Sequence, residues 1–160
     1  MAINKSKTDS EITKNFTEKQ KVINAGKAES FSISFQDIDT SQKYGSSFED
    51  WQKIGLLSST LRVLQGYCAR PLIEQVDNNK FTIYGNFPNA NTTLFKHPEH
   101  VSLDAKWARI HITGVAIIVG HIIGNIFFLV FLDKTHKFYL TKTERTRQFG
   151  KQYYRLPKGK

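Results

Sequence analysis

Side chains that can transfer protons and hold phosphate gather in one short part of this 160-residue chain. Arg109 and His111 lie two positions apart, so a strand would present both on the same face. His136, Lys137 and Tyr139 follow within thirty residues. Histidine can act as acid or base near neutral pH, while arginine and lysine can hold phosphate oxygens. This set, which we expect to have no carboxylate nearby, suits metal-independent RNA cleavage, in which a base activates the 2′-hydroxyl and cations stabilise the phosphorane.

Each histidine also suits a simpler role when it is taken alone. His111 and His121 fit ordinary hydrogen-bonded positions in the core or at the surface. His97 and His100 could join His111 as metal ligands, but Pro98 blocks a regular helix between the first two. We therefore expect no metal site and no cofactor, and we expect a loop with surface histidines instead.

Charge is distributed very unevenly along the chain. Of the formal net charge of +9, residues 31–104 carry −2, whereas residues 105–160 carry +9 with Asp133 and Glu144 as their only acids. Such asymmetry indicates a polyanionic partner, either nucleic acid or an anionic membrane, although a basic tail kept for solubility would look the same. The single cysteine, Cys68, excludes an internal disulfide and suits a reducing cytosol.

The last twenty residues mix cations with aromatic rings, a composition that suits stacking on unpaired bases and binding of phosphates. A solvated, disordered tail is the alternative. The predicted nucleic-acid-binding residues are Lys134, Lys142, Arg145, Arg147, Lys151, Tyr153, Tyr154 and Arg155.

The elements that position these residues include one strongly apolar stretch. Val115 to Leu132 holds eighteen residues without formal charge, which is barely the length of a membrane span. However, Gly124-Asn125 is typical of a tight hairpin turn, and the flanking residues are rich in Val, Ile and Phe. We therefore predict two antiparallel strands, 115–123 and 126–132. The protein is expected to be soluble and cytoplasmic, to be recovered without detergent, and to have no membrane partner.

The remaining pattern predicts an α+β fold. N-terminal helices and one strand should pack on a C-terminal antiparallel sheet of three to four strands, followed by a basic tail. Residues 1–29 form a polar extension with a helix around 13–25 or no structure, residues 30–140 a single domain, and residues 141–160 the tail. The expected elements are strands at 31–35, 81–83 and 107–113, a helix from Ser47 to Gln65, a short helix from Pro71, and an edge segment at 137–140.

The segments WARIHITG and VAIIVGHIIGNIFFLVFLDKTHKFYL resemble the C-terminal sheet of RelE-type ribonuclease toxins from bacterial toxin–antitoxin pairs. The resemblance covers about residues 106–140. It implies that Arg109 matches the phosphate-stabilising arginine, and that His136 and Tyr139 match the terminal catalytic pair, with Lys137 as an added cation. It also implies RNA, including ribosome-bound mRNA, as substrate and a protein antitoxin as partner. The chain departs from the family in its long N-terminal part, its basic tail and the spacing of His136 and Tyr139.

Three hypotheses follow from these residues. The first is a metal-independent endoribonuclease, acting as a toxin or defence effector. The second is a protein that binds RNA or DNA through its basic sheet and tail without cutting it. The third is a subunit whose apolar sheet edge pairs with a protein partner. No sequence feature separates the first two.

Overall fold

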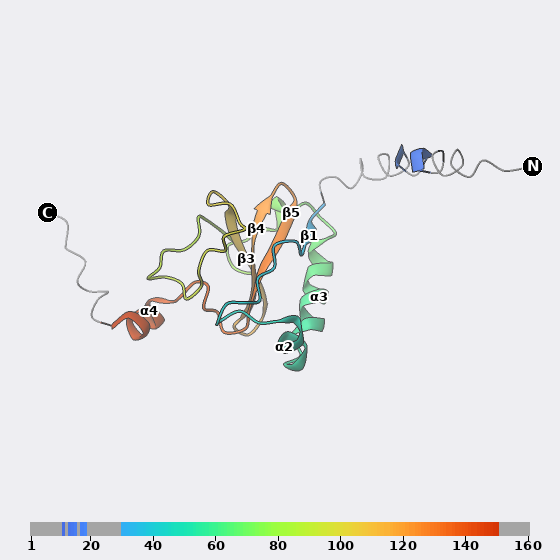
Figure 1. Cartoon of the computed structure of the whole chain (residues 1–160). Helices are drawn as coiled ribbons and strands as arrows, with labels where there is room; N and C mark the ends of the chain where they lie inside the picture. Colours follow the sequence, from blue (N-terminus) through green and yellow to red (C-terminus); the bar gives the residue numbers. More distant parts are fainter. Residues whose placement is uncertain (1–10, 12, 16, 19–29, 151–160) are drawn as a thin grey trace, which may run out of the picture.

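The computed structural model describes residues 30–150 and six helical residues at positions 11, 13–15, 17 and 18. Its centre is a five-stranded sheet with the strand order β1-β5-β4-β3-β2 (Figure 1). The strands are β1 (Ser32–Ser34), β2 (Phe81–Gly85), β3 (Lys106–Thr113), β4 (Ala116–Ile123) and β5 (Ile126–Asp133). The helices are α2 (Phe48–Lys53), α3 (Leu56–Tyr67), the 3₁₀ helix η1 (Ile73–Gln75) and α4 (Lys142–Phe149).

The α+β class is confirmed, but the sheet differs from the expected three or four antiparallel strands. Strands β2 to β5 form an antiparallel meander, and β1 adds a fifth strand that runs parallel to β5. The register pairs Ser32 with Ile126. The alternating residues around Ile33 indicate a strand, but this pattern is local and does not specify which strand it joins or in which direction.

The predicted hairpin is confirmed. Strands β4 and β5 pair with Ile123 opposite Ile126, and Gly124 in the turn has φ +58°, which an L side chain rarely adopts. The apolar stretch therefore forms two buried strands instead of one helix. No helix in the described part of the chain has both the length and the apolar character to cross a membrane.

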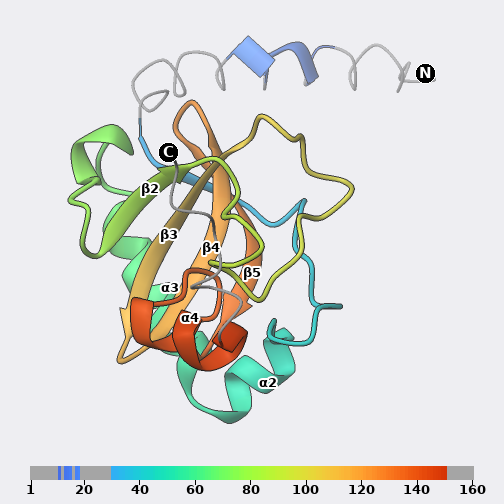
Figure 2. The same ribbon diagram turned by 90° about the vertical axis from the view of Figure 1, so that its left-hand side faces the viewer.

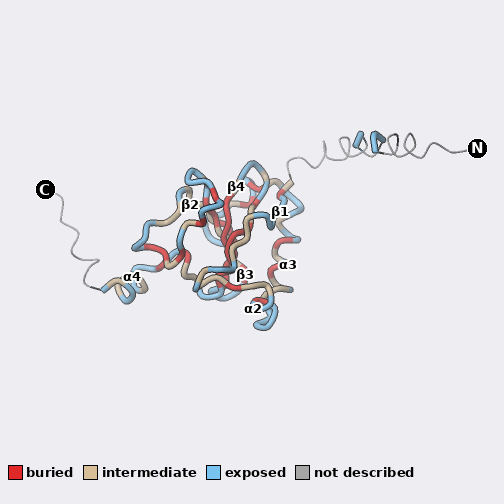
Figure 3. Tube along the Cα trace, in the orientation of Figure 1, coloured by how far each residue is buried: buried red, intermediate tan, exposed pale blue. Residues whose placement is uncertain are grey.

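The sheet has a hydrophobic core on each face. Helices α2 and α3 cover one face, where Trp51 and Leu64 pack with strand residues such as Ile110 and Phe127. The other face is covered by loops, and its core includes Trp107, Phe131 and Phe138. Burial is accordingly concentrated in the strands (Figure 3).

The expected helix from Ser47 to Gln65 is two helices. The Ser47 side chain accepts a hydrogen bond from the backbone N–H of Asp50, as predicted for a helix cap. The chain then turns at Gly55, where φ is +76°, and α3 begins at Leu56. The Trp51 indole N–H donates to the Thr60 hydroxyl over 2.8 Å and joins the two helices. Apolar residues recur every three to four positions on both sides of this turn, and for this reason the sequence predicted a single helix.

The expected edge segment at the C-terminal end is wrong. Residues 137–140 form no strand, because Phe138 and Leu140 turn into the core and their backbone N–H groups bond to Asp133 and Thr92. Within the predicted tail, residues 142–149 form the helix α4, and Thr141 and Glu144 form a capping box at its start, while residues 151–160 lie outside the described residues. Figure 2 shows α4 in front of the loop-covered face of the sheet.

Candidate nucleic-acid site

Two stacked tyrosines and a nearby arginine lie on the loop-covered face. The rings of Tyr84 and Tyr139 are 4.7 Å apart and nearly parallel, with an angle of 6° between them. The Arg109 guanidinium lies close to the Tyr84 phenol. Burial raises the pKa of Tyr84, and the charge and hydrogen-bonding capacity of Arg109, which act to lower it, only partly offset this, so the phenol is neutral at neutral pH. Tyr139 keeps 39% of its surface exposed, so its ring is accessible to a ligand.

The loop after β5 is organised by Asp133, which is fully buried. Its carboxylate accepts hydrogen bonds from the backbone N–H groups of Phe138, at 2.8 Å, and Thr135, at 3.3 Å. Burial raises the pKa of Asp133, and these N–H groups and the nearby His136 act in the opposite direction. An acid directly after an apolar strand, followed by Lys-Thr-His, is a usual turn signal. This signal could have indicated a structural role for Asp133 beyond its charge.

His136 is held in a conformation that only a few non-glycine residues adopt, with φ +58°. Its Nδ1 lies 3.2 Å from the Tyr139 carbonyl oxygen. A carbonyl can only accept a hydrogen bond, so Nδ1 carries the proton and Nε2 is the basic nitrogen of the neutral ring. No hydrogen bond from the described part of the chain occupies Nε2.

Lys137 is already paired with an acid. Its ammonium donates to Glu144 over 2.9 Å, and both side chains are 28% exposed. This hydrogen bond, together with one from the Thr141 N–H, lowers the pKa of Glu144 to about 2. The pair connects the loop to the first turn of α4 and compensates the Lys137 charge.

The structure brings together some of the predicted catalytic residues and sets one apart. Arg109, His136 and Tyr139 are connected through Tyr84 and the Tyr139 carbonyl. Lys137 belongs to the same loop. His111 lies on β3 as predicted, but its Nε2 is 2.6 Å from the Gly114 carbonyl oxygen, so it is bonded to the β3–β4 turn.

The predicted cations surround this cluster only in part. Lys134, Lys142 and Arg147 are exposed, and Arg145 is half-buried on α4. Lys151, Tyr153, Tyr154 and Arg155 lie outside the described residues. The described site is therefore a pair of aromatic rings with Arg109 close to Tyr84, beside a short helix that carries three cations.

The expectation that the sheet histidines have no nearby carboxylate is wrong. His121 is 5% exposed and its Nε2 lies 2.7 Å from Asp37 Oδ2, while its ring stacks on Phe128 at 4.8 Å. Asp37 lies in a loop 84 positions earlier, so no local pattern could have indicated this pair. Tyr84 was missed for a similar reason, because only the packing of the loop after β5 places Tyr139 on it.

The remaining histidines are separated by their contacts. His97 packs edge-on against Phe87 and Trp107, whereas His100 Nε2 lies 2.8 Å from the Asp37 carbonyl oxygen. Within the described ranges, no group of three or more His, Cys, Asp or Glu side chains is placed to hold a metal ion.

Comparisons with protein-family models, with curated proteins and with solved structures give no match. The resemblance to RelE-type toxins therefore stays a prediction from the residues quoted above.

Proposed function

We propose that this protein binds single-stranded RNA through the surface formed by Tyr84, Arg109, Tyr139 and the cations around them. The observation that carries the proposal is the Tyr84–Tyr139 stack, with Arg109 close to Tyr84 and Tyr139 39% exposed. Aromatic rings beside cations bind unpaired nucleotides, because bases stack on the rings while phosphates contact the charges.

The charge distribution supports the same surface. The segment that supplies Tyr139 also supplies Lys134 and leads directly into Lys142, Arg145 and Arg147. Glu144 is the only acid in α4, and Lys137 already neutralises it. The exposed cations Lys134, Lys142 and Arg147 are thus available to a polyanion, and RNA binding to this surface should depend strongly on salt concentration.

The test is the affinity of Tyr139→Ala for a fluorescent twelve-nucleotide RNA without secondary structure. Loss of one stacking platform should weaken binding about tenfold, since stacking contributes about 1–3 kcal/mol per base. Phe35→Ala is the matched control, because Phe35 is 47% exposed but packs beside Phe48 in α2. Equal affinity of the wild type and Tyr139→Ala would contradict the proposal.

Cleavage of the bound RNA is a second candidate function, and the geometry of His136 favours it. A histidine with positive φ, a bonded Nδ1 and an unoccupied Nε2 is oriented as a general base would be. Nε2 would take the proton of a 2′-hydroxyl, whose oxygen would attack the adjacent phosphorus. The 5′-oxygen would leave with a proton from water, and Arg109 would stabilise the charge on the phosphorane.

This reaction predicts products and requirements that can be measured. Cleavage should continue in EDTA, leave 2′,3′-cyclic phosphate ends and spare DNA, which lacks the 2′-hydroxyl. His136→Ala should lower the rate about a hundredfold while RNA affinity is retained. His100→Ala is the control, because His100 is an exposed histidine outside the site. If the protein binds RNA but leaves it intact under these conditions, the cleavage proposal is wrong and the RNA-binding proposal stands. The antitoxin partner and the cytoplasmic location stay predictions.

A further inference from the structure

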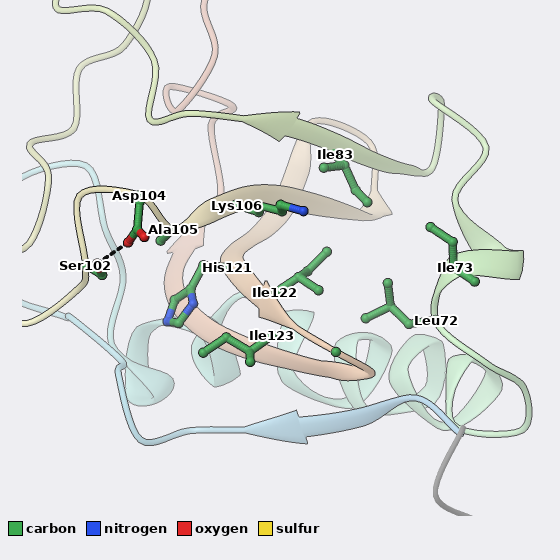
Figure 4. A pocket seen from close by; sticks show the side chains of 11 residues that line it. Leu72, Ile73, Ile83, Ser102, Asp104, Ala105, Lys106, His121, Ile122 and Ile123 are labelled. Carbon is green, nitrogen blue, oxygen red and sulfur yellow. Dashed lines mark hydrogen bonds between the residues drawn. The ribbon is translucent and has the colours of Figure 1, made fainter.

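A cavity of about 590 Å³ lies at the end of the sheet where β3 begins and the β4–β5 turn closes (Figure 4). One part of its wall is aliphatic, and the other part is polar. The aliphatic part consists of Leu72, Ile73, Ile83, Ile122 and Ile123, and the polar part consists of Ser102, Asp104, Lys106 and His121. Small-molecule sites in proteins typically have such volumes and such mixed walls.

The aliphatic wall is fixed in place before any ligand binds. The Leu72 N–H donates to the Asn125 side chain over 3.2 Å, which joins the segment before η1 to the β4–β5 turn. The buried Gln75 amide donates to three carbonyl groups, those of Tyr67, Arg70 and Pro71. A wall with this many hydrogen bonds would lose little conformational freedom on binding.

The polar part contains groups without partners. Lys106 forms no ion pair with any residue in the described part of the chain, and its amine points toward the aliphatic side chains in Figure 4. His121 is 95% buried, and its Nδ1 has no hydrogen-bond partner among the described residues although Asp37 holds Nε2. Asp104 lies on the same wall, where its carboxylate accepts from the Ser102 hydroxyl and forms no ion pair with Lys106. The charge of Lys106 is therefore not paired by any acid in the described part of the chain.

Large apolar side chains are exposed at the mouth of the cavity. Ile73 is 70% exposed and Ile123 is 61% exposed, although both line its wall. Leu103, which does not line the cavity but lies in the chain between its lining residues Ser102 and Asp104, is 85% exposed. Exposed apolar residues gathered around a hollow indicate a binding site more strongly than the same residues scattered singly.

We propose that this cavity binds a small amphiphilic anion, an aliphatic carboxylate of about six to ten carbons. The carboxylate pairs with Lys106, and the chain lies against Ile122, Ile123, Ile73 and Leu72. This binding site is separate from the RNA surface, since Tyr84, Arg109 and Tyr139 are not among the residues that line the cavity. The inference does not depend on RNA binding.

Calorimetric titration of the full-length protein with octanoate tests the proposal, and the amide signals of Ile122, Ile123 and Gly124 report the location by NMR. Octanoate should bind with saturation and shift these signals. Octanol and acetate, which lack the charge and the chain, should each bind at least tenfold more weakly. No saturation with octanoate, or equal binding of all three probes, would overturn the proposal.

Two exposed residues allow the wall to be changed without disturbing the core. Lys106→Met should weaken octanoate binding about tenfold, and Ile73→Ser should weaken it about fivefold because it removes apolar surface from the wall. Lys53→Met on α2 is the matched control, since Lys53 is an exposed lysine outside the cavity. Unchanged affinity in Lys106→Met would sink the proposal. RNA affinity measured on the same variants should stay unchanged, so failure here is distinguishable from failure of the RNA surface.

Discussion

Gly120 shows how one small residue allows the sheet to close. It lies in β4 beside the irregular pairing with β5, and a Cβ atom built there would be 2.0 Å from the Phe128 carbonyl oxygen. Contacts this short are impossible, so any side chain requires movement of the β5 backbone. The apolar run around Gly120 predicted a strand, but the close approach of backbone that explains the glycine is a property of the folded sheet.

We therefore expect Gly120→Ala to destabilise the protein by about 3 kcal/mol or more, because the displaced backbone belongs to the central strands. Urea denaturation measures the loss. Gly66→Ala is the matched control: it lies inside α3 with open space at its Cβ position, so it should stabilise the protein by about 0.5–1 kcal/mol. Equal effects of the two substitutions would contradict this account.

Asp133 should make stability depend on pH in an unusual direction. Burial raises the pKa of this carboxyl in the folded state, so the folded protein retains the proton longer than the unfolded chain does. The contribution of Asp133 to the free energy of unfolding therefore decreases as the pH rises from about 4, the ordinary pKa of aspartate in the unfolded chain, to the raised pKa of the folded state. Above that raised pKa the contribution stays constant. Asp133→Asn removes this titration while an amide oxygen remains to accept from Phe138.

The measurement is the free energy of unfolding of wild type and Asp133→Asn between pH 4 and pH 7. The difference between the two proteins should change across this window, with the wild type losing stability relative to the variant as the pH rises. Parallel profiles would show that Asp133 has no raised pKa. His136 faces the same carboxylate, so His136→Ala should widen the window, because it removes a charge that lowers the pKa.

At the scale of elements, short-range patterns predicted most of the structure. Alternating residues located β3, Gly124-Asn125 located the β4–β5 turn, and Ser47 located the start of α2. The errors arise where a distant contact decides the outcome. Residues 137–140 have strand-forming side chains, but the buried Asp133 carboxylate bonds to the Phe138 N–H that a strand ladder would need.

The candidate site shows the same contrast between residues indicated by local patterns and contacts that depend on distant parts of the chain. Arg109, His136 and Tyr139 could be selected from residue type and spacing, because all lie near the end of one sheet. The tyrosine stack, by contrast, joins residues 55 positions apart, and the His121–Asp37 pair joins residues 84 apart. Such pairings depend on how loops pack, and a single sequence contains no local signal for them.

Helix α4 provides a prediction at this scale, because it buries no side chain and depends on its cap. Thr141→Ala removes the hydroxyl that accepts from the Glu144 N–H, which should destabilise the helix by about 1 kcal/mol. RNA affinity should then fall a few-fold while the urea midpoint stays nearly constant. Thr143→Ala, an exposed position within α4, is the control. A large shift of the urea midpoint would show that α4 supports the core.

At the scale of the whole molecule, the excess positive charge and the central strands belong to the same part of the chain. Residues 105–160 carry the net charge of +9 and also contribute the three central strands. Within the binding surface, Arg109 is therefore attached directly to a central strand, β3. A cation on such a rigid base keeps its position when a ligand binds, which favours affinity.

Deletion of residues 141–160 removes seven cations and one acid. RNA affinity should fall, and the slope of log affinity against log salt concentration should flatten by about 0.7 for each phosphate that the truncated protein no longer neutralises. Fluorescence anisotropy at several salt concentrations measures both. An unchanged slope in the truncated protein would show that this segment is a passive extension.

Because β1 pairs with β5, β1 is synthesised long before its partner strand exists. β1 leaves the ribosome early, but its partner begins at Ile126, 94 positions after Ser32. In the folded protein Phe31 is 2% exposed and packs against Tyr67, Phe81 and Phe127. Until β5 has been synthesised, the core that buries Phe31 is incomplete. Contacts between such distant positions form slowly, and the nascent chain exposes apolar surface until these contacts have formed. Recovery of folded protein should therefore depend on chaperones that shield the first half of the chain during translation.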